Sequence, residues 1–257
     1  KINRNYSVHI AICLFKLRGT ITKIGEIMTA QIITIFNQKG GVGKTTTTCQ
    51  LAGTLGYRGF DVLVADMDPQ ETSSSWISNG PEGFRFPATL WAGHRYAREN
   101  ITAELGKLSA KYDLILVDCA PSVDNASTWA SLLVSDLAII PTKLSPADTS
   151  ALPAALQLVK SARQKCGRDY PVRILATAFR KQRADERAML EQISANEAYP
   201  EFTVIPIQLG VRVAFTRSML SGATAHSMPK PGEAVAELDM LADHICDLLG
   251  LPTEKGE

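Results

Sequence analysis

The chain has 257 residues, with 27 Lys and Arg against 26 Asp and Glu and a formal net charge of +1. This length predicts one large α/β domain or two small ones, and 45% hydrophobic with 21% charged residues excludes disordered, collagen-like and coiled-coil proteins. The near-zero charge also excludes a globally basic nucleic-acid-binding protein, so any DNA contact must come from a local basic patch. No stretch approaches the roughly 20 apolar residues of a membrane helix.

The first 27 residues differ from the rest, with five Lys and Arg against one Glu and a single apolar run. A signal peptide would need a longer apolar region and a cleavage site of small residues. We therefore expect residues 1–27 to be a leader or a non-native extension, and the natural start to be Met28. A single domain would then cover 28–250, followed by a polar tail at 251–257.

Strand and helix patterns alternate from Gln31 onward. Buried strands are predicted at 32–37, 60–65, 114–117, 137–141, 172–177 and 202–205. Helices are predicted at 44–57, about 124–134, 147–166, 183–196 and 234–249, and 72–93 is predicted as a long loop with short elements. Continuous apolar strands separated by helices indicate a mostly parallel, twisted α/β sheet with helices on both faces. On the last helix, Glu237 is assigned to a solvated acidic side.

The five cysteines are widely spaced and contain no C-x-x-C pair. This pattern favours a reducing compartment, here the cytoplasm, and disfavours a disulfide framework or a zinc site. We expect most of them to be buried free thiols.

A glycine-rich loop follows the first predicted strand and leads into the 44–57 helix. Glycines let the N–H groups of such a loop turn inward around phosphate oxygens, and the helix N-terminus adds its positive dipole. Lys44 is expected to bridge the β- and γ-phosphates of a nucleotide, and the Thr45 hydroxyl to ligate Mg²⁺. This is the pattern of a P-loop NTPase fold. The predicted phosphate-binding residues are Gly40, Gly41, Val42, Gly43, Lys44, Thr45 and Thr46.

Three aspartates lie at the ends of two further strands. Asp66 and Asp68 follow the 60–65 strand with their side chains in register, and Asp118 follows four apolar residues in the Walker B pattern. Ligands of open α/β sheets bind at the carboxyl ends of the strands, so we expect the three aspartates to converge on the glycine-rich loop. Each of them alone could instead cap a helix.

These segments resemble the ParA/MinD family of deviant Walker A ATPases. The matching segments are residues 39–46, Asp-Met-Asp-Pro-Gln at 66–70 and Asp-Cys-Ala-Pro-Ser at 118–122. The loop has Gln38 where the usual spacing has glycine, and it carries an additional lysine, Lys39. The resemblance extends from about residue 28 to 249 and is looser in the last third. It implies ATP and Mg²⁺ as cofactors and a homodimer that forms on ATP.

The resemblance also implies residue roles. Lys39 would reach across the dimer to the partner subunit's phosphates, and Asp68 would orient the attacking water. Asp118 would hold Mg²⁺ through water together with Thr45, and Asp66 would support the nucleotide loop. The implied catalytic set is therefore Lys39, Lys44 and Asp68. Because a lysine supplied by a second subunit joins catalysis to dimerisation, turnover should be weak until a partner completes the site.

Three branches of the family fit poorly. The nitrogenase iron protein needs two cluster-binding cysteines per subunit, and Cys119 does not fit their spacing. MinD ends in a basic amphipathic membrane helix, whereas the tail here cannot insert, so no membrane partner is expected. Larger ParA proteins carry an N-terminal helix-turn-helix domain, which about 30 residues cannot build. The short ParA type of plasmid or chromosome partition remains.

ATPases of that type bind DNA without sequence preference as ATP dimers. The charge here is polarised, because residues 160–217 carry a net +5 and residues 218–257 a net −5. Arg212 matches a DNA-contacting arginine of the family, and Arg217 could contribute. The cluster of Arg180, Lys181, Arg183 and Arg187 is better explained as a solvated helix face.

The adenine pocket is poorly marked, and Thr177 and Pro206 at strand ends are its candidates. The sequence thus predicts a nucleoid-associated ATPase that dimerises on ATP, binds DNA and is stimulated by a centromere-binding adaptor. The alternatives are a related cargo-positioning or conjugation-assisting ATPase, or a nucleotide-binding regulatory module with little turnover.

Overall fold

The computed structural model describes residues 29–96, 100–122, 126–195 and 202–256. The expected leader at 1–27 lies outside them, so that boundary stays a prediction. The strands are β1 (Gln31–Ile35), β2 (Val62–Asp66), β3 (Thr89–Trp91), β4 (Leu114–Asp118), β5 (Leu137–Lys143), β6 (Val172–Phe179), β7 (Phe202–Val204) and β8 (Leu209–Gly210). The helices are α1 (Lys44–Tyr57), α2 (Thr72–Ser78), α3 (Ile101–Leu108), α4 (Ala126–Leu132), α5 (Pro146–Thr149), α6 (Leu152–Cys166), α7 (Ala184–Ser194), α8 (Val213–Leu220) and α9 (Glu233–Leu249), with 3₁₀ turns η1 (Gly93–Arg95) and η3 (Ala225–Ser227).

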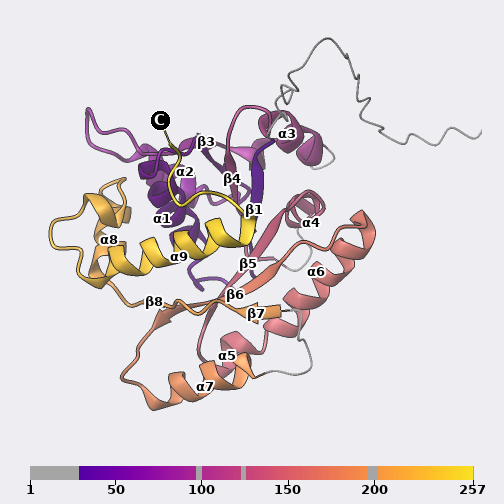
Figure 1. The fold of residues 1–257 in the computed structure, drawn as a ribbon, viewed down its shortest axis with the longest axis vertical. Helices are drawn as coiled ribbons and strands as arrows, with labels where there is room; N and C mark the ends of the chain where they lie inside the picture. The colour runs from indigo at the N-terminus through magenta and orange to yellow at the C-terminus, as the bar shows by residue number, and fades with distance from the viewer. Residues whose placement is uncertain (1–28, 97–99, 123–125, 196–201, 257) are drawn as a thin grey trace, which may run out of the picture.

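The strands form one parallel sheet in the order β3-β2-β4-β1-β5-β6-β7, with β8 paired to β6 (Figure 1). The predicted fold class is therefore confirmed. β1 lies between β4 and β5, where the chain turns from one half of the sheet to the other. Ligands of such sheets bind outside the carboxyl ends of the strands at this point. The topology thus puts the loop after β1 at the expected binding position.

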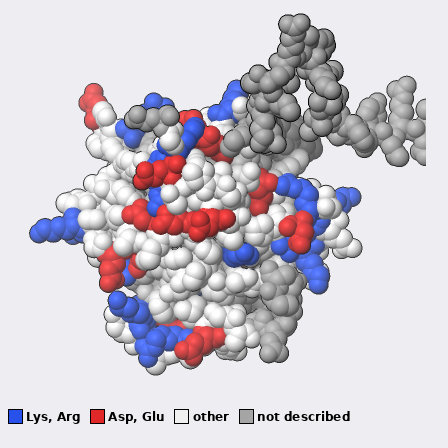
Figure 2. All heavy atoms as spheres, in the orientation of Figure 1, with Lys and Arg blue, Asp and Glu red and all other residues white. Residues whose placement is uncertain are grey.

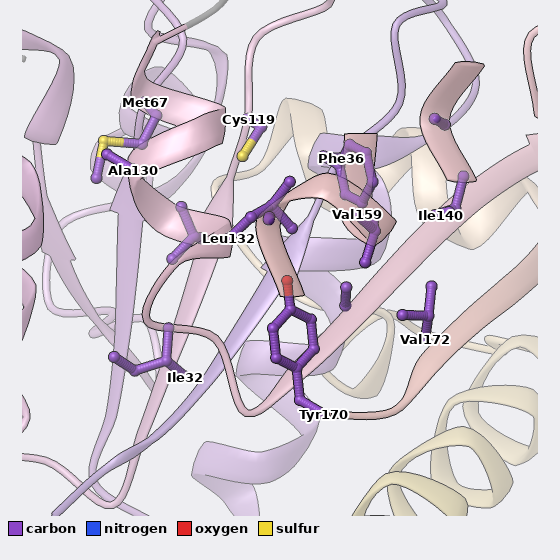
Figure 3. Close-up of a cluster of buried hydrophobic side chains, with 14 of the residues drawn as sticks. Ile32, Phe36, Met67, Cys119, Ala130, Leu132, Ile140, Val159, Tyr170 and Val172 are labelled. Carbon is purple, nitrogen blue, oxygen red and sulfur yellow. The ribbon is translucent and has the colours of Figure 1, made fainter. Parts of the chain in front are cut away.

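Two apolar layers cover the sheet, because alternate strand residues point to opposite faces. On one face, Ile33 and Ile35 of β1 pack with α1 and α9, including Leu51 and Leu241. On the other face, Ile32 packs in a cluster with residues from α3, α4 and α6. Figure 3 displays this second cluster around Ile32, Leu132 and Val159. The helices on both faces are what the continuous apolar strands predict.

The structure differs from the sequence prediction in its short elements. The predicted 147–166 helix is two helices, α5 and α6, because Pro153 lies in the first turn of α6. A proline ring clashes with the carbonyl four residues earlier and prevents a continuous helix. The two-turn helices α3 and α8 have too few apolar repeats to be recognised. The short elements predicted within the 72–93 loop are α2 and β3, so that prediction is confirmed. In the part of the chain described here, no helix is long and apolar enough to cross a membrane.

Candidate functional site

The glycine-rich loop joins the central strand β1 to α1. Gly41 and Gly43 have φ of 71° and 89°, in the left-handed region that residues with a Cβ rarely adopt. Gly43 is the N-cap of α1, so the loop passes directly into the helix N-terminus. From β6, the Thr177 hydroxyl donates a hydrogen bond of 2.7 Å to the Val42 carbonyl. The loop is therefore held from both sides as a cradle for an anion.

The two lysines of this loop have different surroundings. Lys44 is buried, and its Nζ donates to the Lys39 carbonyl at 2.9 Å. Burial lowers the pKa of Lys44, and the negative charges of Asp118 and, more weakly, Asp68 oppose that shift. The Lys39 residue is exposed, and its backbone N–H donates to Asn37 Oδ1. Among the described residues the Lys39 side chain makes no ion pair, so its ammonium group is free to contact another molecule.

Asp118 ends β4 beside Asp66 of β2 and Ile35 of β1. Its Oδ2 accepts hydrogen bonds from the Thr45 hydroxyl at 2.8 Å and from the Ser73 hydroxyl. Its Oδ1 is buried and has no hydrogen-bond partner among the described residues. Burial raises the pKa of Asp118 to about 7. A hydroxyl and a carboxylate with an unsatisfied oxygen, both beside the phosphate loop, fit a hydrated Mg²⁺.

Asp66 and Asp68 lie at the same strand end, but both carboxylate oxygens of Asp66 already accept hydrogen bonds from neighbouring residues of the chain. Its two oxygens accept from the Asp68 N–H at 3.0 Å and from the N–H and hydroxyl of Ser74 at 2.9 and 2.6 Å. Asp68 Oδ1 accepts from the Gln70 N–H at 2.9 Å. Asp66 therefore supports the segment that carries Asp68 and the start of α2. That Asp66 also supports the nucleotide loop stays a prediction.

A cavity of about 220 Å³ opens beside the phosphate loop. Thr177 lines this cavity with the segment 209–212 and Phe215, and its place in an adenine pocket stays a prediction. Pro206 instead lines a neighbouring cavity of about 460 Å³ with Phe179 and Met240. The sequence singles out Arg212 in this segment for DNA contact only, and it does not identify residues 209–212, 215 and 216 as lining a cavity.

Arg212 is the N-cap residue of α8, and carboxylates surround its guanidinium group. It forms ion pairs with Glu233 at 2.5 Å and with Glu237, both on α9. Glu237 is buried and also accepts from the Gly210 N–H at 3.0 Å, so its assignment to a solvated side is wrong. These carboxylates raise the pKa of Arg212, with the Glu237 hydrogen bond as the largest cause. Arg217, in contrast, is exposed and makes no ion pair among the described residues.

The surface around α9 is acidic. Figure 2 displays a line of acidic side chains across the middle of this face, over α9. Three of the basic residues predicted to form a solvated face at the start of α7 pair with carboxylates, and the fourth, Arg187, donates to the Lys181 carbonyl at 2.7 Å. Arg180 contacts Glu186 at 2.7 Å, and Arg183 contacts Asp185 at 2.6 Å. These ion pairs balance the basic charges, as expected for a solvated helix face.

Sequence reasoning missed several polar residues of this site. Ser73 reaches Asp118 from 45 positions earlier in the chain, and Asn37 holds the β5 end through the Pro141 carbonyl at 2.8 Å. Ser73 lies in a run of Ser and Thr that looks like a loop. No local sequence pattern identifies Ser73 as a site residue, because its role depends on the end of β4 lying beside α2 in the fold.

The profile of the "CobQ/CobB/MinD/ParA nucleotide binding domain" matches residues 33–221. The chain belongs to this family. It is a ParA/MinD-type ATPase related to a carboxysome-distribution protein. It is 29% identical over 194 residues to the maintenance of carboxysome distribution protein A of Gloeobacter kilaueensis, covering 75% of this chain and 82% of that protein.

Two solved structures have the same fold. An ATP complex of a McdA variant from Cyanothece superposes with a TM-score of 0.72 at 17% identity, covering 89% of this chain and 99% of that one. A putative plasmid partition protein from Borrelia burgdorferi bound to AMPPNP gives 0.64 at 21% identity, covering 85% and 99%. At these identities the likeness establishes the fold alone.

Proposed function

We propose that this ATPase dimerises on ATP, binds DNA without sequence preference and hydrolyses ATP when a centromere-binding adaptor stimulates it. The cargo would be plasmid or chromosome DNA, and the protein would act in the cytoplasm on the nucleoid. The observation that carries the proposal is the meeting of Lys44, Thr45 and Asp118 at the phosphate loop, with the exposed Lys39 beside them. A partition protein among the structural neighbours supports this reading.

In this proposal each polar side chain acts by position and charge. The Gly40–Thr46 loop and Lys44 would bind the β- and γ-phosphates of ATP, while Thr45 and Asp118 would hold Mg²⁺, which neutralises phosphate charge when bound. Binding would require the Lys44 ammonium group to exchange the Lys39 carbonyl for phosphate oxygens. Asp68 would orient the attacking water, and Thr177 would line the pocket for the base. Phosphoryl transfer needs such positioning more than covalent chemistry.

The DNA contact would lie on the α8 side of the nucleotide cavity. Arg217 is exposed there, and Arg212 lines the cavity itself. Arg212 would reach a DNA phosphate only by leaving Glu233 and Glu237. A single exposed arginine binds DNA weakly, so retention on DNA needs the basic residues of both subunits of a dimer.

The test separates nucleotide binding from hydrolysis. The Lys44→Ala variant should lose ATP binding in a fluorescent-nucleotide titration, because the buried ammonium group that faces the phosphates is gone. The Asp68→Ala variant should bind ATP with unchanged affinity but hydrolyse it about 10²-fold more slowly and stay on DNA. Normal hydrolysis by Asp68→Ala would show that another group orients the water.

A related cargo-positioning ATPase is the second candidate, favoured by the carboxysome-distribution relative. A conjugation-assisting ATPase and a low-turnover regulatory module are further alternatives. ATPase rates should be compared for the protein alone, with DNA, and with DNA plus a co-encoded partner. Stimulation by DNA with a small centromere-binding partner supports partition, and stimulation with a cargo adaptor supports positioning. Without any stimulation the module would be favoured.

A further inference from the structure

The segment that carries Asp68 is contacted at both ends by one histidine. His94 lies in η1, with its side chain only 8% exposed. Its Nδ1 is 3.3 Å from the Asp66 carbonyl oxygen, and its Nε2 is 2.9 Å from Glu71 Oε1. Asp66 precedes Asp68 by two residues, and Glu71 follows it by three. The imidazole ring therefore bridges the two ends of a six-residue loop.

Glu71 has a backbone conformation that is unusual for its residue type. Its φ is 54°, in the left-handed region, where the Cβ of an L-residue is crowded. Residues in this region persist where the surrounding structure holds them, and they are concentrated at functional sites. Here the Glu71 N–H donates to the Asp68 carbonyl at 2.9 Å, and its carboxylate also accepts from Arg95 at 2.9 Å. Hydrogen bonds from Arg95 and His94 lower the pKa of Glu71, which keeps it anionic.

η1 packs closely against the same loop, residues 66–71. A Cβ at Gly93 would lie 2.7 Å from the sulfur of Met67, the residue between Asp66 and Asp68. The Met67 N–H in turn donates to the Asp118 carbonyl at 2.9 Å. Gly93 therefore lets η1 lie directly against the Met67 side chain, within the loop that His94 contacts at both ends.

We propose that His94 and Glu71 form a clamp that positions Asp68 for hydrolysis. The proposal rests on the water-orienting role of Asp68 given above. His94 is a positioning residue, because it contacts the loop and not the reacting atoms. The Asp66 carbonyl and the Glu71 carboxylate are both acceptors, so a ring N–H of His94 donates to one of them, and the tautomer sets which one.

The first test is steady-state ATP hydrolysis by His94→Ala in the presence of DNA and partner. We expect kcat to fall about 10-fold while the KM for ATP stays within about twofold, because a displaced catalytic group affects the transition state and not ATP binding. His226→Ala is a matched control, since His226 Nε2 lies 3.1 Å from the Asp239 carboxylate, on α9. Its kcat should equal that of the wild type.

A double-mutant cycle tests whether the two residues act as one unit. The Glu71→Ala variant should lose as much kcat as His94→Ala, and the double variant should lose no more than either. His94→Asn and His94→Gln each keep one amide donor, at the positions of Nδ1 and Nε2 respectively, and should recover kcat in part. Additive losses, or full recovery by either amide, would overturn the clamp.

Amide hydrogen exchange gives a measurement that does not depend on hydrolysis. In His94→Ala without nucleotide, exchange in residues 67–71 should be at least about fivefold faster than in the wild type and in His226→Ala. Unchanged exchange together with unchanged kcat in His94→Ala would refute the clamp, even where Asp68→Ala abolishes hydrolysis and the proposed function stands. If the wild type itself does not hydrolyse ATP, the proposed function fails and the exchange result alone decides the clamp.

Discussion

Asp66 and Asp118 lie opposite each other in the register of β2 and β4, but their carboxylates have different partners. Both oxygens of Asp66 accept hydrogen bonds from the chain, whereas Oδ1 of the buried Asp118 has no partner among the described residues. A buried carboxylate without full hydrogen bonding is costly, which is consistent with the raised pKa of Asp118. Side-chain surroundings therefore separate the supporting aspartate from the one suited to a metal.

The two arginines proposed to contact DNA should respond differently to truncation. Arg217→Ala should weaken DNA retention and reduce the salt slope by about one, with an unchanged Tm, because the side chain is exposed. Arg212→Ala should also weaken retention, but it should cost roughly 1–3 kcal/mol of stability, since Glu237 loses its charged partner. DNA retention at several salt concentrations and thermal unfolding would check both. Unchanged retention and salt slope in both variants would contradict the proposed DNA contact.

At the scale of elements, α1 both forms the end of the phosphate loop and packs closely under the chain around Pro87. A Cβ on Gly56 would lie 1.7 Å from the Pro87 carbonyl oxygen, and one on Gly53 would lie 2.2 Å from Thr224. The glycines of α1 therefore permit a close approach that no other residue allows. This approach fixes the direction of α1 relative to the sheet, and with it the position of Lys44.

Gly56→Ala should destabilise the protein by at least about 2 kcal/mol, because the backbone around Pro87 must move to admit the methyl group. Gly106→Ala in α3 is the control, since its Cβ would meet nothing within 4 Å. That variant should gain roughly 0.5–1 kcal/mol from helix propensity. Urea denaturation midpoints of both variants against the wild type are the measurement. Equal midpoints for the two variants would show that the close approach is not a constraint.

At the scale of the whole molecule, the proposed ATP dimer depends on Lys39. Lys39→Ala should still bind ATP, because Lys44 and the loop amides remain, but it should stay monomeric with ATP and hydrolyse it at least about 10-fold more slowly than the wild type. Light scattering with ATP and Asp68→Ala as the dimer-forming reference would measure this. A Lys39→Ala protein that dimerises and hydrolyses like the wild type would exclude a role for this lysine between subunits.

The sequence by itself determined the parallel sheet, the phosphate loop and the convergence of three aspartates. Those features depend on local patterns: apolar runs, glycines and the alternation of side chains along a strand. The 44–57 helix was predicted to the residue, because its start is part of the loop motif.

Only the tertiary structure decided which side chains from different elements contact each other beside the carboxyl ends of the strands. Ser73 reaches Asp118, His94 reaches Glu71, and Glu237 of α9 is buried against Arg212. These contacts join positions 23 to 45 residues apart on different elements, and such pairs depend on how the elements pack. For the same reason the sequence does not show that two carboxylates from α9 surround Arg212.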